Sequence, residues 1–152
     1  MKRVIRFLGV FLLTGYLCSG AVAHAATYYV ATNGSNSRTC AQAQSISTPK
    51  LGLNNALTCL RAGDTLYVRG GYYDDSLESN FYNGFPSGTS WSNKVRIAAY
   101  PGDGAVWLRP LSNFTSAARS GRVVLLDSNV SYVELDGINL NKSYLINSKY
   151  IF

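Results

Sequence analysis

Histidine is almost absent from this chain, and long apolar runs are absent after its first residues. The single histidine, His24, lies at the end of a segment that we expect to be removed on export. The remaining chain then has no histidine for a catalytic triad, a general base or a metal site. Any chemistry would depend on carboxylates, Lys, Arg, Tyr or Ser.

The beginning of the chain is typical of a secretory signal peptide. Residues 1–6 carry three basic side chains, residues 7–16 are apolar, and residues 23–25 (Ala-His-Ala) suit a signal peptidase. A transmembrane anchor is the alternative, but the apolar run is too short to span about 30 Å of hydrocarbon. A lipoprotein site at Cys18 is disfavoured because Leu17 precedes it. We expect a secreted, periplasmic or cell-surface protein with no membrane span after cleavage.

Cleavage of residues 1–25 changes the charge balance. Three of the fourteen basic residues leave, so residues 26–152 hold eleven Lys and Arg against eight Asp and Glu. These charges are scattered, whereas a nucleic-acid-binding protein needs a clustered basic patch. The composition therefore argues against a nucleic-acid partner. The length that remains is enough for one modest domain.

Two cysteines, Cys40 and Cys59, remain after cleavage. An even count in an exported protein favours a disulfide bond. The bond would close a loop of about twenty residues, worth about 3 kcal/mol by the chain-entropy relation. Two buried free thiols are the alternative, and two cysteines are too few for a structural zinc site with four ligands.

Residues 47–63 give the one helical pattern in the chain after the signal. Thr48 offers a capping hydroxyl, and Pro49 suits the first position of a helix. Gly63 follows where a C-cap residue is expected. The apolar side chains recur at helical spacing and form one stripe: Leu53, Ala56, Leu57 and Leu60.

The rest of the chain consists of short β-prone segments separated by turns rich in Gly, Asn and Asp. This pattern indicates an all-β class, but the spacing alone does not choose between a sandwich and a solenoid. The strongest turn signal is the Pro-Gly-Asp-Gly sequence at residues 101–104. The expected strands lie at residues 26–31, 64–69, 94–100, 105–108, 122–126, 132–135, 138–140 and 144–152.

Several short segments of the sequence match the pattern of one protein family. They are Tyr-Tyr-Val at 28–30, Asn-Gly-Ser at 33–35, Thr-Pro-Lys at 48–50, Arg-Ala-Gly-Asp-Thr-Leu-Tyr-Val-Arg-Gly-Gly-Tyr-Tyr at 61–73, and the segments 95–102 and 132–138. As a set they resemble the N-terminal part of secreted right-handed parallel β-helix proteins of the pectate-lyase-like superfamily. The resemblance covers nearly the whole of residues 26–152. It implies that the first strand and the helix cap the first coil.

A solenoid with an open first coil would expose its apolar interior and an unpaired strand edge to water. An amphipathic α-helix laid across that end covers both. Residues 145–152 are apolar and β-prone, with no closing turn or helix. We therefore expect the N-terminal coils of a longer right-handed parallel β-helix, truncated at its C-terminus. A small all-β domain that ends in a central strand is the alternative.

The resemblance also implies a chemistry. The lyases of that superfamily abstract a proton next to a uronate carboxylate, with Lys or Arg as the base and Ca²⁺ held by Asp and Glu. Those groups would lie on coils beyond residue 152, and no motif here carries them. Locally, Asp74, Asp75 and Glu78 gather three carboxylates that suit Ca²⁺. A solvated loop is the alternative, because no EF-hand spacing is met.

The same loop and its continuation are rich in aromatic residues. Tyr82, Phe85 and Trp91 lie among Asn, Gly and Ser, so they are candidates for stacking on sugar rings. The alternative is an insertion that packs onto the coil through its own aromatic side chains.

These observations predict an exported β-helix protein that binds or processes polysaccharide. If it is an enzyme, the resemblance implies a polysaccharide lyase or glycoside hydrolase acting on acidic glycans, for example a Ca²⁺-dependent polyuronate lyase. One alternative is a non-catalytic cell-surface or matrix β-helix protein that binds glycans or protein partners. Another is a small secreted all-β binding domain. Fold alone does not decide among them.

Overall fold

The computed structural model of the chain describes residues 25–74, 77–78, 85–109, 124–126 and 129–141. The predicted signal peptide, apart from Ala25, and the predicted strand at 144–152 lie outside these ranges. In chain order the elements are β1 (Thr27–Val30), a 3₁₀ helix (Gln42–Gln44), α1 (Leu53–Leu57), β2 (Thr65–Val68), β3 (Gly71–Tyr73), β4 (Leu77–Glu78), a 3₁₀ helix (Trp91–Asn93), β5 (Val95–Ala99), β6 (Val106–Leu108), β7 (Val124–Leu125), β8 (Val133–Asp136) and β9 (Ile138–Leu140).

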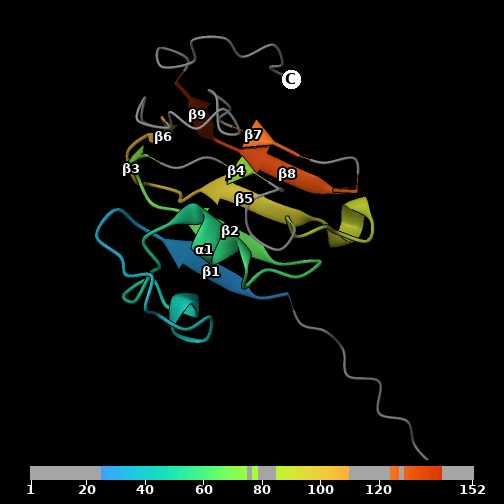
Figure 1. The fold of residues 1–152 in the computed structure, drawn as a ribbon, viewed down its shortest axis with the longest axis horizontal. Coiled ribbons are helices and arrows are strands. Elements are labelled where there is room, and N and C mark those ends of the chain that lie inside the picture. Colours follow the sequence, from blue (N-terminus) through green and yellow to red (C-terminus); the bar gives the residue numbers. More distant parts are fainter. Residues whose placement is uncertain (1–24, 75–76, 79–84, 110–123, 127–128, 142–152) are drawn as a thin grey trace, which may run out of the picture.

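The described strands form three sheets, and every pair within them is parallel (Figure 1). The first sheet has the order β1-β2-β5-β8, the second β3-β6-β9, and the third β4-β7. The chain passes through the sheets in the same order twice, as β2-β3-β4 and then β5-β6-β7. β8 and β9 repeat the first two steps. The prediction of an all-β chain with little helix is confirmed, and its strands are parallel.

Alternation along the strands separates the interior from the surface. In β2, Leu66 and Val68 are buried, whereas Tyr67 is half-buried on the outer face. Because the strands pair in register, residues of one kind stack across the sheet: Leu66 lies beside Ile97, and Tyr67 lies beside Tyr29. The interior therefore consists of rows of aliphatic side chains that run across the strands.

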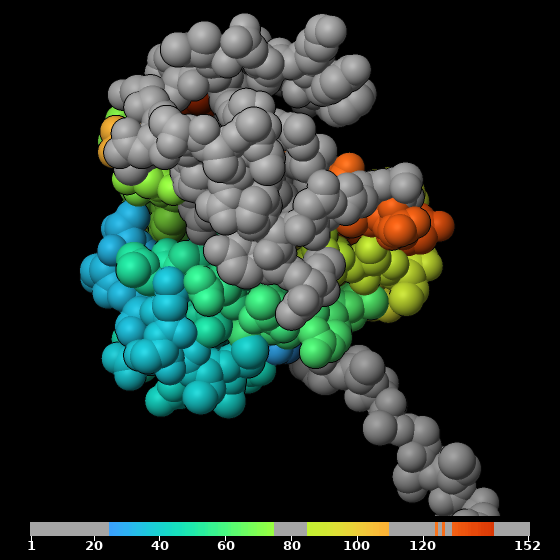
Figure 2. Space-filling model, in the orientation of Figure 1, coloured from blue at the N-terminus to red at the C-terminus, as the bar shows by residue number. Residues whose placement is uncertain are grey.

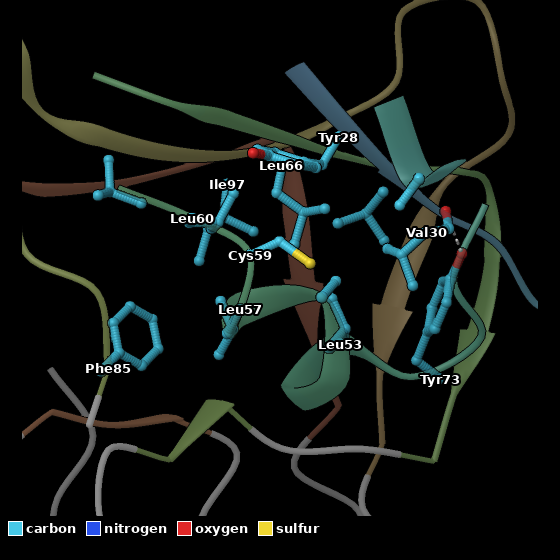
Figure 3. Close-up of a cluster of buried hydrophobic side chains, with 14 of the residues drawn as sticks. Tyr28, Val30, Leu53, Leu57, Cys59, Leu60, Leu66, Tyr73, Phe85 and Ile97 are labelled. Atoms are coloured by element: carbon cyan, nitrogen blue, oxygen red, sulfur yellow. Dashed lines mark hydrogen bonds between the residues drawn. The ribbon is translucent and has the colours of Figure 1, made fainter. Parts of the chain in front are cut away.

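The helix α1 packs against this interior (Figure 3). Its apolar residues Leu53, Ala56 and Leu57 are buried, and so is Leu60, which follows the helix and completes the predicted stripe. These side chains belong to the same buried cluster as Tyr28 and Val30 of the edge strand β1. Burying a leucine side chain is worth about 1.5–3 kcal/mol, so the stripe accounts for much of the attachment of the helix.

The predicted start of the helix is wrong. The sequence pattern predicts Pro49 at its first position, but α1 begins at Leu53 and ends at Leu57, well before Gly63. The reason is a competing interaction with β1. The backbone N–H of Lys50 donates to the Tyr29 carbonyl at 3.0 Å, and the Lys50 carbonyl accepts from Ala31 at 2.9 Å. This pairing keeps residue 50 extended along the edge of β1.

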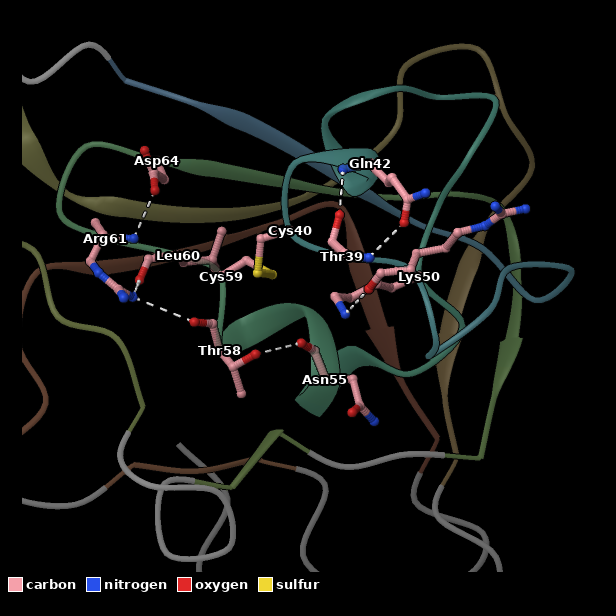
Figure 4. The surroundings of a disulfide bond; sticks show 11 residues. Thr39, Cys40, Gln42, Lys50, Asn55, Thr58, Cys59, Leu60, Arg61 and Asp64 are labelled. Carbon is pink, nitrogen blue, oxygen red and sulfur yellow. Dashed lines mark hydrogen bonds between the residues drawn. A yellow bond between two sulfur atoms is a disulfide. The ribbon is translucent and has the colours of Figure 1, made fainter.

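The disulfide bond between Cys40 and Cys59 ties the loop between β1 and α1 to the segment just after the helix (Figure 4), with the two Cα atoms 5.4 Å apart. The disulfide predicted from the cysteine count is therefore present. Thr39 and Gln42 strengthen the loop by exchanging side-chain-to-backbone hydrogen bonds of 2.8 and 3.2 Å. Figure 2 shows the residues of this loop and helix, in blue to green, gathered on one side of the molecule away from β8 in orange.

The chain leaves β2 before Gly70 and Gly71, as the sequence predicts, but a new strand, β3, already begins at Gly71. Gly71 is the first residue of β3 and has a φ of 147°. A Cβ atom at this position would lie 2.9 Å from the Cγ2 atom of Thr32. The glycine therefore permits the sharp change of direction that sends the chain from the first sheet to the second.

Candidate functional site

The three-stranded sheet turns the central residue of each strand outward: Tyr72 is exposed, and Trp107 and Asn139 are half-buried. The register places Tyr72 of β3 beside Trp107 of β6, and Trp107 beside Asn139 of β9. The neighbours of Tyr72 and Trp107 point inward, since Tyr73 and Leu108 are buried. Side chains alternate between the two faces of a strand, so each of these three-residue strands turns only its central side chain outward. The outward row therefore consists of two aromatic rings and one amide.

The two rings of this row are stacked on each other. The centroids of Tyr72 and Trp107 are 6.4 Å apart, and their planes are inclined by 19°. The Cζ atom of Arg109 lies 4.6 Å from the centroid of Tyr72, and Arg109 Nε donates to Asp74 Oδ1 at 3.1 Å. Tyr72 is nevertheless 56% exposed. We call these four residues together with Asn139 the aromatic face.

The backbone beneath the aromatic face is held firmly. The backbone N–H of Arg109 donates to the Tyr73 carbonyl at 2.9 Å. This bond continues the backbone pairing of β3 and β6 as far as Arg109, the residue whose guanidinium contacts Tyr72. The Tyr73 hydroxyl donates to the Arg69 carbonyl at 2.7 Å, and burial raises the pKa of this phenol far above its ordinary value. Asn139 Nδ2 donates to the Val106 carbonyl at 3.0 Å. These contacts fix the aromatic row before any ligand arrives.

The side chains of the aromatic face are suited to binding a ligand. Exposed aromatic rings present flat apolar surface at a low cost in side-chain entropy, and the guanidinium and amide beside them are hydrogen-bond donors. Carbohydrate rings have an apolar C–H face and hydroxyl groups around their edge. A stacked Tyr–Trp pair flanked by Arg and Asn therefore has the complementary chemistry.

The four-stranded sheet carries a second aromatic group on its outer face. Tyr29, Tyr67 and Tyr100 have centroids 5.5–6.0 Å apart, and Arg69 lies 5.2 Å above the ring of Tyr100. Arg69 also pairs with Asp103 in the turn at 101–104. All three rings are half-buried, so they offer less surface to a ligand than Tyr72 does.

Ion pairs connect β5 and β8 on the same sheet. Lys94 Nζ lies 2.6 Å from Glu134 Oε2, and Arg96 Nε lies 2.8 Å from Glu134 Oε1. Arg96 also pairs with Asp136. The hydrogen bonds from Lys94 and Arg96 hold the pKa of Glu134 below its ordinary value, and the Arg69 hydrogen bond does the same for the pKa of Asp103. These contacts stabilise the outer surface of the sheet.

The predicted sugar-stacking residues are placed differently from one another. Phe85 is only 7% exposed and belongs to the buried core, as the packed-insertion alternative expects. Trp91 is 65% exposed and meets Tyr132 edge-to-face. Tyr82 lies outside the described residues. The structure therefore does not bring these three predicted residues together in one described surface.

The predicted Ca²⁺ ligands are only partly described. Asp74 Oδ1 accepts a hydrogen bond from Arg109 Nε at 3.1 Å. Asp75 lies outside the described residues, and of Glu78 only the backbone on β4 is described. Among the described residues, no group of three His, Cys, Asp or Glu side chains is arranged to hold a metal ion.

Sequence reasoning missed the aromatic face. Tyr72 belongs to the segment 61–73 that carries the family resemblance, and Trp107 belongs to the predicted strand 105–108, and neither is a predicted site residue. The sequence does contain a signal for Tyr72 and Trp107, because each lies in the middle of a short β-prone segment near a glycine turn. Gly71 precedes Tyr72, and Gly104 precedes the segment that contains Trp107. The register between β3 and β6 is needed to turn that signal into a pair of stacked rings.

Within the ranges that the structure describes, no helix is long and apolar enough to cross a membrane.

Comparison with protein-family models found no match, and no curated protein matched the sequence. Among solved structures, the chain is similar to one described as "The complex structure of XylC with xylose", with 24% sequence identity and a TM-score of 0.42. The match covers 53% of this chain and 11% of that chain. A TM-score of this size carries no argument about function.

Proposed function

We propose that this chain forms the first coils of an exported right-handed parallel β-helix and binds polysaccharide through the aromatic face. The proposal for the fold is supported by the order of the strands, since two consecutive passes visit the three sheets in the same sequence. The hand follows from a general preference: about 98% of crossovers between parallel strands of one sheet are right-handed. The loop and helix beside β1 would act as the cap of the first coil.

The observation that carries the functional proposal is the stacked pair of Tyr72 and Trp107. A side chain that is 56% exposed contributes little to the core, yet Arg109 and Trp107 hold its ring in a fixed orientation. Preorganised rings lose little side-chain entropy on binding, which raises affinity. A rigid aromatic surface flanked by polar groups suits a sugar ring better than a folded protein partner, which needs a larger apolar patch.

Affinity electrophoresis tests the proposal. The purified chain is run in native gels that contain hydroxyethyl cellulose, xylan, polygalacturonate or alginate, so that neutral and acidic polysaccharides are both sampled. Binding retards the chain in at least one gel. Tyr72→Ala and Trp107→Ala each remove a stacking surface, and we expect each to weaken that retardation by on the order of tenfold, or about 1.4 kcal/mol.

Leu51→Ala is the matched control. Leu51 is another exposed large hydrophobic residue, but it lies in the loop beside β1, and its removal should leave the retardation unchanged. A chain that migrates freely in all four gels would contradict polysaccharide binding. Retardation that survives both aromatic substitutions would contradict the assignment to this face.

Processing of the bound polysaccharide stays a prediction. The polyuronate lyase activity and its Ca²⁺ dependence rest on family resemblance, and the described residues add no support to them. Incubation of the protein with polygalacturonate and Ca²⁺, followed by the absorbance of unsaturated product, measures that activity directly.

A further inference from the structure

A second exposed aromatic pair lies at the end of the four-stranded sheet where β5 and β8 begin. Trp91 belongs to the 3₁₀ helix just before β5, and Tyr132 lies just before β8. Their ring centroids are 5.6 Å apart with perpendicular planes, and the two side chains are 65% and 38% exposed. Figure 1 shows the helix of residues 91–93 on the right of the first sheet, whereas β3, β6 and β9 lie on the left.

The backbone at this corner is strained and held in place. Tyr132 has a φ of 53° and is the one residue other than glycine with a positive φ among the described residues. A bulky residue adopts this conformation only when its surroundings impose it, and such positions cluster at functional sites. Here the Tyr132 carbonyl accepts from the Val95 N–H at 3.0 Å, and the preceding Ser131 carbonyl accepts from the Gly88 N–H at 3.0 Å.

Gly88 makes this close packing feasible. A Cβ atom on it would lie 2.7 Å from the carbonyl oxygens of both Asn93 and Tyr132. Three segments of the chain therefore meet at backbone distance, and the aromatic pair stands on a rigid base. The base fixes the rings while leaving most of the indole of Trp91 in contact with water.

The residues next to Trp91 in the sequence carry polar side chains. Trp91 is flanked by Ser90 and Ser92, whose hydroxyl oxygens are 2.9 Å apart, and Asn93 Nδ2 donates to Thr89 Oγ1 at 2.7 Å. Hydroxyl and amide groups around an aromatic surface match the hydroxyl edge of a sugar. A lipid surface or an apolar protein partner would instead need a continuous apolar patch.

We propose that the Trp91–Tyr132 corner is a second carbohydrate-binding site, which takes a sugar unit of the same polysaccharide that the aromatic face binds. This inference rests on the proposed function. The two sites are separated by the length of β5, about 16 Å for five residues, together with the turn at 101–104. One long glycan can engage both sites, and the second contact then benefits from a high effective concentration. A short oligosaccharide can engage only one of them.

The two tryptophans of the chain make the test direct. Trp107→Phe leaves Trp91 as the sole indole fluorophore, and Trp91→Phe leaves Trp107. Each variant is titrated with hydroxyethyl cellulose and, separately, with polygalacturonate while the tryptophan emission is followed. With a polysaccharide that binds, we expect both reporters to change and to saturate over the same concentration range.

Affinity gels with the same two polymers give a second measurement. We expect Trp91→Ala to weaken retardation by at least about tenfold, through loss of the bivalent contact, while Leu51→Ala leaves it unchanged. A response from Trp107 with a silent Trp91 and an unaffected Trp91→Ala variant would overturn the second site but leave the proposed function standing. Silence from both reporters, with free migration in both gels, would overturn both.

Discussion

Removal of the disulfide should destabilise the chain by an amount that follows from its position. Cys40 and Cys59 are 19 residues apart, and the chain-entropy relation gives about 3 kcal/mol for a loop of this length at 25 °C. Cys59 is buried in the core, so replacing it with alanine also removes a packed sulfur atom, at a cost of roughly 1 kcal/mol. The double variant Cys40→Ala/Cys59→Ala should therefore lose about 4 kcal/mol.

Urea unfolding separates the two contributions. The oxidised chain, the chain reduced with a phosphine, and the double variant are compared by circular dichroism. Reduction retains both sulfur atoms, so it isolates the loop constraint of about 3 kcal/mol, which lowers the urea midpoint by about 1–3 M. Equal midpoints for the oxidised and reduced chains would contradict the stabilising constraint that the bond places on the loop before α1.

Three further predictions concern the core, a corner glycine and the ion pairs. Ile97→Val removes one methylene from a fully buried side chain and should cost about 1 kcal/mol in urea unfolding; no change would mean that the rows of the interior are loosely packed. Gly88→Ala should destabilise by more than about 1 kcal/mol because its Cβ meets backbone atoms, whereas Gly104→Ala has open space and should be neutral; equal effects would contradict the close packing at the corner. Ion pairing lowers the pKa of Glu134 and of Asp103 from the ordinary values of 4.5 and 3.8, so their contribution to stability is complete above those values and is lost as the pH falls through the lower folded-state values. Urea midpoints measured between about pH 6 and pH 2 should show this loss, and high salt should reduce it.

Much of the fold could be read from local patterns. Alternation in the sequences around Leu66 and Ile97 predicts strands with one buried face, and the helical spacing of Leu53 and Leu57 predicts the buried stripe. The interaction that moves the helix start could not be read in this way. Thr48 and Pro49 form a sound local start signal, but the pairing of residue 50 with β1 is a long-range contact that local propensity does not contain.

The candidate site was harder to predict than the fold, for a related reason. A single exposed tyrosine such as Tyr72 has no meaning until the register places Trp107 beside it and the chain returns with Arg109. The predicted candidates share only their proximity in sequence. Phe85 and Trp91 lie six residues apart, yet one ring enters the core and the other faces water. Parallel strands bring together residues about 35 positions apart, so neighbours in sequence are poor guides to neighbours in a site.

The most direct test of the aromatic face is a ¹H–¹⁵N NMR spectrum of the chain recorded with and without a retarding polysaccharide. The two tryptophan indole groups give separate side-chain signals. If the face binds glycan, the Trp107 indole signal and the Tyr72 amide signal shift on addition, while the amide of the buried Ile97 stays in place. Shifts confined to other surfaces, or no shift of the Trp107 signal at a saturating concentration of the polymer, would contradict it.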